Sequence, residues 1–557
     1  MDINPLFLCD FYKVGHPFQY PKGTTFVYSN LTPRKSRIEG VDKMVLFGPQ
    51  YFIKEYLIDY FNRNFFSRSR EEILAEYKEL IKTSLGSDLP TYDHILSLHD
   101  LGYIPIVIKA LPEGSQVDMR VPCLTIYNTK PEFYWVTNFL ETILSACIWQ
   151  ASTSATIAKE YRRIFDKWGE KTGFPRAVVP FQGHDFSFRG MSSFESACLS
   201  GAGHLLSFSG TDTIPAIPFL QKYYNATGFI GGSIPATEHS VMCAGGSENE
   251  LETFRRLITE VYPSGFLSVV SDTWSLWDVL ERILPALKDE ILGRDGKLVI
   301  RPDSGDPADI ICGWNSDKIM HLTCSDPDAT EDWSCRAFDN WYSNPYWNKY
   351  NGESPEVLEW NGRYFLYGGD GYRKDALNKR GEVSKAELKG VIECLWDLFG
   401  GTNTNKGFKL LDSHIGAIYG DSISLKVAEN ICKRLHDKGF VSQCIFGIGS
   451  FTYQHITRDT CGLAMKATYV VVNGKEINIF KDPVTDDGTK KSSKGLLRVV
   501  SIGQVEPMSN RFYHDHYEVL EEVSWEDQEK GELKEIFRDG KLLKDWTLDE
   551  IKSNLNK

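Results

Sequence analysis

The sequence predicts an α/β protein in which a parallel α/β barrel lies between the two halves of a second, sheet-rich domain. Short apolar runs recur from about residue 175 to about residue 450, where they alternate with segments of helical character. Such runs are typical of fully buried parallel strands, and the alternation is typical of right-handed βαβ units. Hairpin signals follow after residue 460. The predicted segments are 1–174, 175–455 and 456–557, and the first and last together form one sheet-rich α+β domain.

The predicted barrel strands break directly onto polar residues or glycine. In α/β barrels the active site forms where the carboxyl ends of the strands meet the following loops, so we expect these strand ends to converge on one anionic or sugar-bearing ligand. The alternative is that each aspartate is an ordinary N-cap of the helix that follows the strand. This explains a single such run more readily than it explains four. The five runs are Leu205–Asp212, Leu267–Asp272, Leu298–Asp303, Ile415–Asp421 and Ile445–Ser450.

The N-terminal segment mixes extended stretches with helices. Strands are expected at Thr25–Leu31, at Pro105–Leu111 and within Gln116–Tyr127, and helices at Phe47–Phe66 and Phe133–Trp149. The last of these is the most apolar stretch of the chain, but polar residues interrupt it, which favours a buried helix over a membrane span.

The C-terminal segment carries two hairpin signals. Tyr469–Phe480 is centred on an Asn-Gly pair and Ile536–Leu543 on an Asp-Gly pair, and both pairs favour tight hairpin turns. We expect these late strands to join the early ones in one sheet.

Composition and charge exclude several classes of function. The chain of 557 residues has a net charge of −13, which argues against a nucleic-acid partner because phosphate binding requires a basic face. No apolar run reaches the roughly 18–20 residues of a membrane helix, and Met1–Pro5 lacks the start of a secretory signal. The twelve cysteines form no Cys-x-x-Cys pair, which indicates free thiols in a reducing compartment. A cytoplasmic protein without a membrane partner is therefore expected.

Short motifs follow one another in a characteristic order along most of the chain. They are Asp10–His16, His184–Gly190, Gly210–Thr213, Pro235–Ser240, Ser271-Asp272, Arg301–Gly305, Gly420-Asp421, Thr457–Asp459, Lys466 and Phe480–Pro483. Each is weak alone, but the ordered set resembles the nicotinamide phosphoribosyltransferases, which belong to the type II phosphoribosyltransferases. The resemblance implies a pentosyltransferase that joins nicotinamide to 5-phosphoribosyl 1-pyrophosphate and releases nicotinamide mononucleotide and pyrophosphate in NAD salvage.

For the nicotinamide ring, the resemblance implies an aromatic clamp. Phe186 supplies one face and Tyr12 of a second subunit the other, with Arg301 near the ring; such stacking contributes about 0.5–1.5 kcal/mol beyond burial. Asp212 accepts a hydrogen bond from the amide and repels the carboxylate of nicotinate. The alternative for Phe186 is plain core packing.

For the activated sugar, the resemblance implies that Arg189, His239 and Arg301 face the pyrophosphate and that Asp303 holds the ribose hydroxyls. His239, Arg301, Asp303 and Asp272 are then the catalytic set. Magnesium bound to the pyrophosphate neutralises part of its charge, with Asp272 and Asp303 as its expected protein ligands. Catalysis is expected to be mainly positioning and electrostatic stabilisation.

The 5′-phosphate is expected at glycine turns, which commonly present backbone amides to phosphate. By resemblance these are Gly420 with Asp421, and Gly449 with Ser450. Ser450 stands where relatives have a glycine, but its amide and its hydroxyl can both donate to a phosphate.

Four cations outside the predicted barrel are expected to reach the pyrophosphate across a dimer interface. The resemblance therefore implies a homodimer with shared active sites. The alternative for each lysine is an ordinary solvated surface position. The cations are Arg34, Arg458, Lys466 and Lys481.

His239 carries a second implication. In the family, the equivalent histidine is phosphorylated by ATP, and this couples ATP hydrolysis to synthesis; a neutral imidazole nitrogen is a competent nucleophile near neutral pH. Glu238 is the neighbour expected to orient the ring. The alternative is a histidine that only caps a helix.

One segment departs from the family pattern, and two alternative functions stay open. Residues from about 313 to 388 form an insertion rich in Trp and Tyr, a composition that favours a folded segment over a linker. A nicotinate phosphoribosyltransferase shares the fold, and Asp212 is the feature that argues against it. A non-catalytic binding or signalling protein on the same fold is disfavoured by the complete set of site residues.

Overall fold

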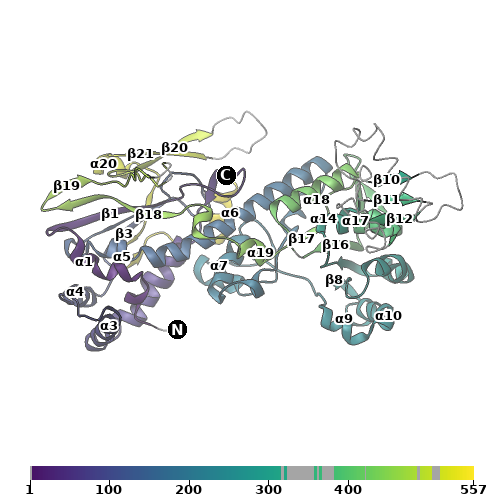
Figure 1. Ribbon diagram of the computed structural model, residues 1–557, viewed down its shortest axis with the longest axis horizontal. Coiled ribbons are helices and arrows are strands. Elements are labelled where there is room, and N and C mark those ends of the chain that lie inside the picture. The colour runs from purple at the N-terminus through teal and green to yellow at the C-terminus, as the bar shows by residue number, and fades with distance from the viewer. Residues whose placement is uncertain are drawn as a thin grey trace, which may run out of the picture. The chain divides into compact units, whose positions relative to one another are not determined.

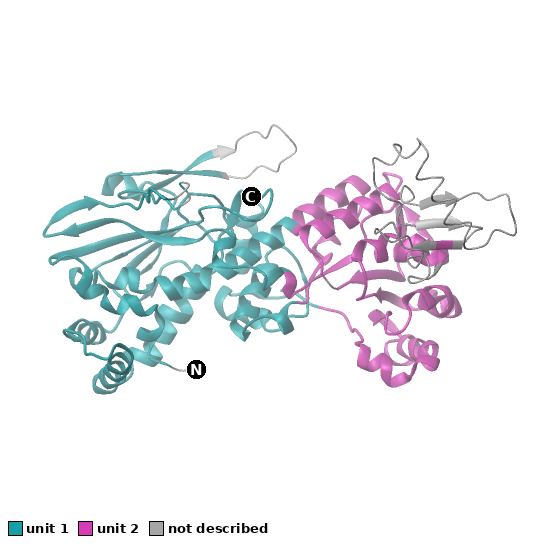
Figure 2. Cartoon of the chain, in the orientation of Figure 1, with its two compact units in different colours: residues 1–160, 187–232, 452–557 teal, residues 161–186, 233–451 magenta. Residues whose placement is uncertain are grey.

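The structure is a computed structural model that describes residues 3–314, 319–322, 357–360, 363–366, 382–420, 422–485, 488, 490–504 and 515–557. The chain divides into two compact units (Figures 1 and 2). Unit 1 comprises Met1–Glu160, Ser187–Gly232 and Thr452–Lys557, and unit 2 comprises Tyr161–Phe186 and Ser233–Phe451. The predicted α/β fold is confirmed: an antiparallel sheet organises unit 1 and a parallel half-barrel sheet organises unit 2.

Unit 1 contains a seven-stranded antiparallel sheet of order β19-β18-β1-β5-β3-β22-β23. The early strands β1, β5 and β3 form its centre and the late strands flank them, since β1 pairs with β18 and β3 pairs with β22. Both predicted hairpins are present, and both join the early strands as expected. The bounds are β1 Thr24–Thr32, β3 Ile106–Ala110, β5 Leu124–Asn128, β18 Ala464–Val472, β19 Lys475–Asn478, β22 Lys534–Arg538 and β23 Lys541–Leu542.

Helices cover this sheet and extend its core. The predicted helix 47–66 begins at Pro49 and continues through π-helical turns, while the stretch 133–149 is divided between α5 and the start of α6. The bounds are α1 His16–Gln19, α2 Pro49–Tyr51, η3 Phe52–Tyr60, η4 Asn62–Phe66, α3 Arg70–Leu85, α4 Asp93–Leu101, α5 Val136–Phe139, α6 Glu141–Thr172, α7 Phe194–His204, α8 Ala216–Tyr224, α20 Trp525–Glu529 and α21 Leu548–Leu555.

The segment Ser187–Gly232 belongs to unit 1, whereas the sequence analysis assigned it to the barrel domain. Leu199 of α7 and Leu220 of α8 are buried in the same apolar core as Ile108 of β3. These two helices therefore gain their burial from unit 1, which explains the division that the structure shows.

Unit 2 is built around five parallel strands of order β6-β17-β16-β9-β8. Their central residues are buried, as expected for strands that helices cover. The predicted strands at 267–272, 298–303, 415–421 and 445–450 are therefore confirmed in place and direction. The bounds are β6 Gly183–Asp185, β8 Ser264–Val270, β9 Asp295–Arg301, β16 Ile415–Tyr419 and β17 Ile445–Ile448.

The prediction of one strand over Leu205–Asp212 is wrong, because only β7, Gly210–Thr211, is extended. The backbone continues to turn beyond α7: the Leu205 amide donates to Gly201 at 3.0 Å and the Phe208 amide donates to His204 at 3.1 Å. The apolar run after α7 therefore continues the turns of that helix and does not form a strand.

The described residues also form several smaller helices and strands. Where the structure describes the predicted insertion, a four-stranded sheet of order β10-β11-β12-β13 is present; Trp333, Trp341 and Trp347 lie outside the described residues. Among the described helices, none has the length and apolar character to cross a membrane. The other bounds are β2 Lys43–Val45, β4 Gln116–Asp118, α9 His239–Gly245, α10 Glu250–Arg256, α11 Leu276–Asp278, α12 Leu284–Ala286, α13 Lys288–Leu292, α14 Pro307–Cys312, β10 Ile319–Leu322, β11 Val357–Trp360, β12 Arg363–Leu366, β13 Glu382–Val383, α17 Lys385–Phe399, β14 Gly401–Asn403, β15 Lys409–Leu411, α18 Leu425–Asp437, α19 Ser450–Tyr453, β20 Arg498–Gln504 and β21 Asp515–Leu520.

Candidate active site

The carboxyl ends of the five parallel strands in unit 2 form one rim, because parallel strands end at the same edge of a sheet. Most of the barrel residues predicted from the sequence follow these strand ends directly. Asp421 lies outside the described residues. The rim residues are Phe186 after β6, Asp272 after β8, Arg301 at the end of β9 with Asp303 beyond it, Gly420 after β16, and Gly449 with Ser450 after β17.

Phe186 is half-buried and lies against two glycines of the neighbouring strands. Its amide donates to the Ile448 carbonyl at 3.0 Å. A Cβ at Gly447 would lie 2.4 Å from Phe186 Cδ2, and a Cβ at Gly420 would lie 3.3 Å from Phe186 Cε2. The ring therefore occupies space that any side chain at Gly447 would take, which is a role of Gly447 that the sequence analysis missed.

Arg301 links the aromatic ring to the acidic part of the rim. Its guanidinium carbon is 5.5 Å from the centroid of the Phe186 ring, a cation–π distance. Its Nη2 is 3.2 Å from Asp303 Oδ2, and both side chains are mostly buried, at 17% and 20% exposure. Arg301 Nη1 also lies 3.5 Å from the Thr237 carbonyl oxygen.

Two buried polar atoms of the rim have no hydrogen-bond partner among the described residues: Arg301 Nε, a donor, and Asp272 Oδ1, an acceptor. The other oxygen of Asp272 accepts from the Asp303 amide at 2.8 Å. Leaving such a group unsatisfied costs about 1–3 kcal/mol. A ligand that offers an anion to Arg301 and a cation or donor to Asp272 would remove both penalties.

His239, the first residue of α9, lies beside Asp272. His239 Nε2 is 3.9 Å from Asp272 Oδ1, and the imidazole is 47% exposed. Its Nδ1 is 3.1 Å from Thr273 Oγ1, while the Glu238 carboxylate accepts a hydrogen bond from the Ser240 hydroxyl. Thr273 is thus a neighbour of the ring that the sequence analysis did not identify, although it directly follows Asp272 in the chain.

The four predicted outlying cations lie together in unit 1. Arg34 follows β1 and its Nε donates to the Gly462 carbonyl at 3.0 Å, while Lys466 lies on β18 opposite Asn30 of β1. The pKa of Lys466 is lowered from 10.5, mainly by burial and further by Arg34, Lys481 and Arg458, against an opposing effect of Glu141. Pairing of β1 with β18 therefore gathers positive charges that repel one another.

The remaining predicted residues also lie in unit 1. Tyr12 is 63% exposed, with Lys13 Nζ 5.2 Å from the centroid of its ring. Arg189 and Asp212 are exposed in short segments after β6 and β7.

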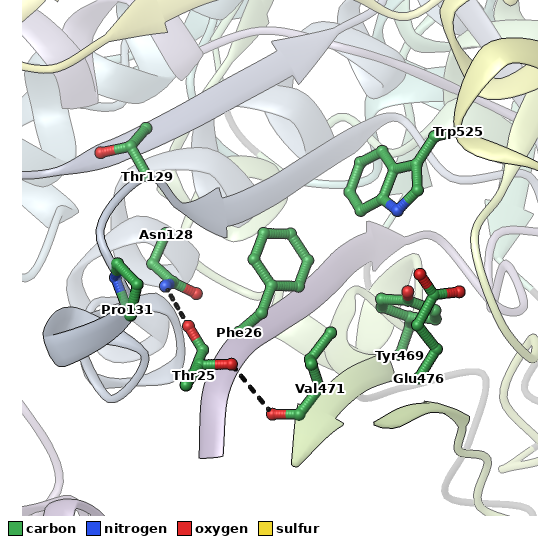
Figure 3. Close-up of a pocket in the computed structure, with 9 residues that line it drawn as sticks. All are labelled: Thr25, Phe26, Asn128, Thr129, Pro131, Tyr469, Val471, Glu476 and Trp525. Carbon is green, nitrogen blue, oxygen red and sulfur yellow. Dashed lines mark hydrogen bonds between the residues drawn. The ribbon is translucent and has the colours of Figure 1, made fainter. Parts of the chain in front are cut away.

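A hollow of about 320 Å³ lies on the sheet of unit 1 and contains none of the predicted site residues (Figure 3). Phe26, Tyr469 and Trp525 pack there edge to face, with centroids 5.4–6.1 Å apart. The three rings pack against one another, as aromatic side chains do in a protein core. The lining residues are Thr25, Phe26, Asn128, Thr129, Pro131, Tyr469, Val471, Glu476 and Trp525.

Comparison with known proteins connects this rim to two family descriptions. A model described as the nicotinate phosphoribosyltransferase (NAPRTase) family matches residues 181–540, and one described as the nicotinamide phosphoribosyltransferase N-terminal domain matches residues 4–108. The nicotinamide phosphoribosyltransferase of Acinetobacter baylyi is 45% identical over 565 residues, covering 99% of this chain and 97% of the relative.

A more distant relative and a solved structure agree with this result. The nicotinamide phosphoribosyltransferase of Mycoplasma pneumoniae is 32% identical, covering 90% of this chain and 97% of the relative. The crystal structure of nicotinate-nucleotide pyrophosphorylase from Pyrococcus furiosus has a TM-score of 0.51 at 12% identity, covering 100% of this chain and 95% of that chain. At this identity the likeness concerns the fold.

Proposed function

This chain belongs to the nicotinamide phosphoribosyltransferase family and is thus a pentosyltransferase, and we propose that it joins nicotinamide to 5-phosphoribosyl 1-pyrophosphate in NAD salvage. The products are nicotinamide mononucleotide and pyrophosphate. The observation that carries the proposal is the position of Arg301, which contacts both the Phe186 ring and the Asp303 carboxylate. One side chain thereby joins a surface suited to a flat heterocycle with groups suited to a phosphorylated sugar.

In this reaction the ring nitrogen of nicotinamide attacks the anomeric carbon while pyrophosphate leaves. Phe186 stacks on the pyridine and fixes its direction of approach, and Tyr12 of a second subunit closes the other face. Asp303 holds the ribose hydroxyls. Arg301, through its unsatisfied Nε, and Arg189 stabilise the negative charge that grows on the leaving group. The residues act by positioning and electrostatics.

The 5′-phosphate is proposed to bind at the ends of β16 and β17. Gly420 and Gly449 offer backbone amides there, together with Ser450. The resemblance adds Asp421, which follows Gly420 in the sequence and lies outside the described residues. A Cβ at Gly449 would meet no atom within 4 Å, so space is open on that side of the backbone. Glycine-lined turns of this kind bind phosphate oxygens through amide dipoles.

The rim fits a magnesium–pyrophosphate complex. Mg²⁺ binds through one or two carboxylates together with substrate phosphates. Oδ1 of Asp272, which has no hydrogen-bond partner among the described residues, is the atom that suits it, with Asp303 as the second carboxylate. Bound there, the ion would neutralise charge on the leaving group. Asp272 Oδ2 meanwhile keeps the Asp303 amide in place.

ATP is the proposed second phosphate donor, and His239 its acceptor. The half-exposed imidazole beside Asp272 is accessible to a nucleotide, and neutral imidazole is nucleophilic near neutral pH. Hydrolysis of the resulting phosphohistidine would then be coupled to synthesis. His239→Ala should abolish ATP hydrolysis and retain a basal synthesis; phosphate transfer from ATP to that variant would exclude His239 from this role.

The protein is further proposed to act as a homodimer whose active sites are shared. Exposed apolar side chains favour a protein interface, and unit 1 exposes Tyr12, Phe194 at 67% and Ile214 at 73%. The cationic cluster, defined as Arg34, Arg458, Lys466 and Lys481, would serve the pyrophosphate of the partner's site. A cytoplasmic location is inferred from the free thiols of the described cysteines.

The deciding experiment is a turnover assay with nicotinamide and nicotinate as competing substrates. We expect a strong preference for nicotinamide, since Asp212 accepts from the amide and repels the acid. Asp212→Asn should keep the fold and weaken that preference. A wild-type preference for nicotinate would favour a nicotinate phosphoribosyltransferase, and binding of the activated sugar without pyrophosphate release would favour a non-catalytic protein.

A further inference from the structure

One nitrogen of the His239 ring lies within hydrogen-bond distance of a side chain, and the other faces a carboxylate beyond that distance. Thr273 Oγ1 lies 3.1 Å from Nδ1, within hydrogen-bond distance. Asp272 Oδ1 lies 3.9 Å from Nε2, beyond that distance. The half-exposed imidazole is therefore fixed by Thr273 and not by the carboxylate beside it.

We propose that Thr273 is a positioning residue that selects the reacting nitrogen of His239. Its hydroxyl oxygen accepts a hydrogen bond from Nδ1–H, so Nε2 carries the lone pair and takes the phosphoryl group. This inference rests on the proposed phosphorylation of His239 by ATP. It replaces Glu238 as the residue that orients the ring, since the Glu238 carboxylate is bound by the Ser240 hydroxyl.

The two residues that precede Thr273 are bound to the end of strand β9 and to the residues beyond it, which holds Thr273 in place. The Ser271 amide donates to the Arg301 carbonyl at 2.9 Å, and Asp272 Oδ2 accepts from the Asp303 amide at 2.8 Å. A β-branched side chain has few χ1 rotamers. The position of the Thr273 hydroxyl is therefore set by strands β8 and β9, which form part of the same rim that would bind the substrates.

The proposed step balances without any further reactant. The Nε2 lone pair forms a bond to the γ-phosphorus of ATP, and the bond from that phosphorus to the bridging oxygen breaks. ADP leaves with the electron pair. The ring keeps Nδ1–H and becomes positively charged, so its hydrogen bond to Thr273 strengthens as the charge develops. The proton leaves Nδ1 afterwards.

The test identifies which nitrogen carries phosphate. The full-length protein is incubated with ATP labelled at the γ-phosphate and quenched in alkali, where both phosphohistidine isomers survive, and ³¹P NMR of the digest separates them. Wild-type protein should carry phosphate on Nε2 alone. In Thr273→Val, which keeps the shape and removes the hydroxyl, labelling should slow about tenfold, the value of one hydrogen bond, and phosphate should appear on Nδ1.

Two further variants control this result. Thr273→Ser restores the hydroxyl and should recover both the rate and the Nε2 isomer. Ser240→Ala disturbs the same helix without touching the Thr273 contact and should change neither. If Thr273→Val unfolds, Thr273→Ala, which also removes the hydroxyl, takes its place with the same expected result.

Three outcomes would overturn the inference. Phosphate on Nδ1 of the wild type, or wild-type labelling of Thr273→Val on Nε2 alone, would reject Thr273 as the selector and leave the phosphohistidine intact. Absence of label from wild-type His239 would reject the ATP coupling and the inference together. Pyrophosphate release measured with the same preparation shows whether the phosphoribosyl transfer itself survives.

Discussion

The rim of unit 2 and the cationic cluster of unit 1 both gather charged residues, but they differ in how far opposite charges are paired. In the rim, Arg301 is paired with Asp303, and Asp303 is tied through its amide to Asp272. In the cluster, Arg458 contacts Asp459 at 3.4 Å, but burial and the three other cations still lower the pKa of Lys466, against an opposing effect of Glu141. The rim side chains are therefore held by contacts with one another, whereas the cluster carries an excess of positive charge that an anion would offset. The rim thus has fixed side-chain positions, and the cluster has a positive charge that attracts anions.

The prediction with the largest expected effect tests whether residues of unit 1 and unit 2 act in the same active site. Tyr12→Ala removes a residue of unit 1 and Asp303→Ala one of unit 2, and each homodimer should be nearly inactive. Mixed dimers restore one site with both native groups, so random exchange should return about a quarter of native activity. Activity of the mixture is measured after subunit exchange has been shown by mass; exchange without recovery would place Tyr12 in its own subunit's site.

The shape of the rim is tested by Gly447→Ala. The added methyl would lie 2.4 Å from the Phe186 ring and 2.6 Å from Gly420 Cα, so the ring must move. We expect the KM for nicotinamide to rise roughly 100-fold, the scale of a misplacement of about 1 Å. Adding Phe186→Leu should recover part of the stability that the alanine variant loses.

The matched control for that substitution is Gly416→Ala on β16, where the nearest atom to the new methyl would be 3.4 Å away. Thermal unfolding and KM of the control should stay close to wild type. Equal KM values for the variants at Gly447 and Gly416 would show that the ring position does not limit nicotinamide binding.

The attraction of the cluster is tested by salt. Arg458→Ala and Lys481→Ala should each raise the KM for 5-phosphoribosyl 1-pyrophosphate about fivefold at low ionic strength, since an exposed ion pair contributes up to about 1 kcal/mol. The effect should shrink at 0.5 M salt. Lys541→Ala, an exposed lysine of β23, is the control. A salt-independent effect would indicate that these residues act through structure.

The smallest expected effect concerns Lys466. Its folded pKa lies below 10.5, so the charged form is disfavoured in the folded state and stability should rise with pH between the folded pKa and 10.5. Lys466→Met removes this dependence, so the stability difference between variant and wild type should narrow over that interval. Chemical unfolding at several pH values measures the difference in the free energy of unfolding. A difference that does not change with pH would mean that folding does not lower the pKa of Lys466.

The parallel strands of the rim could be predicted because buried strands must be apolar and their polar ends stand out against them. The Asn-Gly and Asp-Gly pairs likewise identify hairpins locally. Thr273 and Gly447 could not be found this way. The role of Thr273 depends on the ring of His239, which begins helix α9, and that of Gly447 depends on the ring of Phe186, which follows strand β6. The burial of Ser187–Gly232 in unit 1 also depends on which core accepts α7 and α8, and the local pattern does not specify this.

The pairing of β1 with β18 has a consequence for synthesis on the ribosome. Asn30 and Lys466 lie 436 residues apart, so at about 5–20 residues per second the first strand waits roughly 20–90 s for its neighbour. During that time one edge of β1 is unpaired, and an unpaired edge favours aggregation. Unit 2 emerges in the interval and has its own sheet. The nascent chain therefore contains a unit 2 whose sheet strands have been synthesised and a unit 1 that still lacks β18. Unit 1 is the part that a chaperone would have to shield.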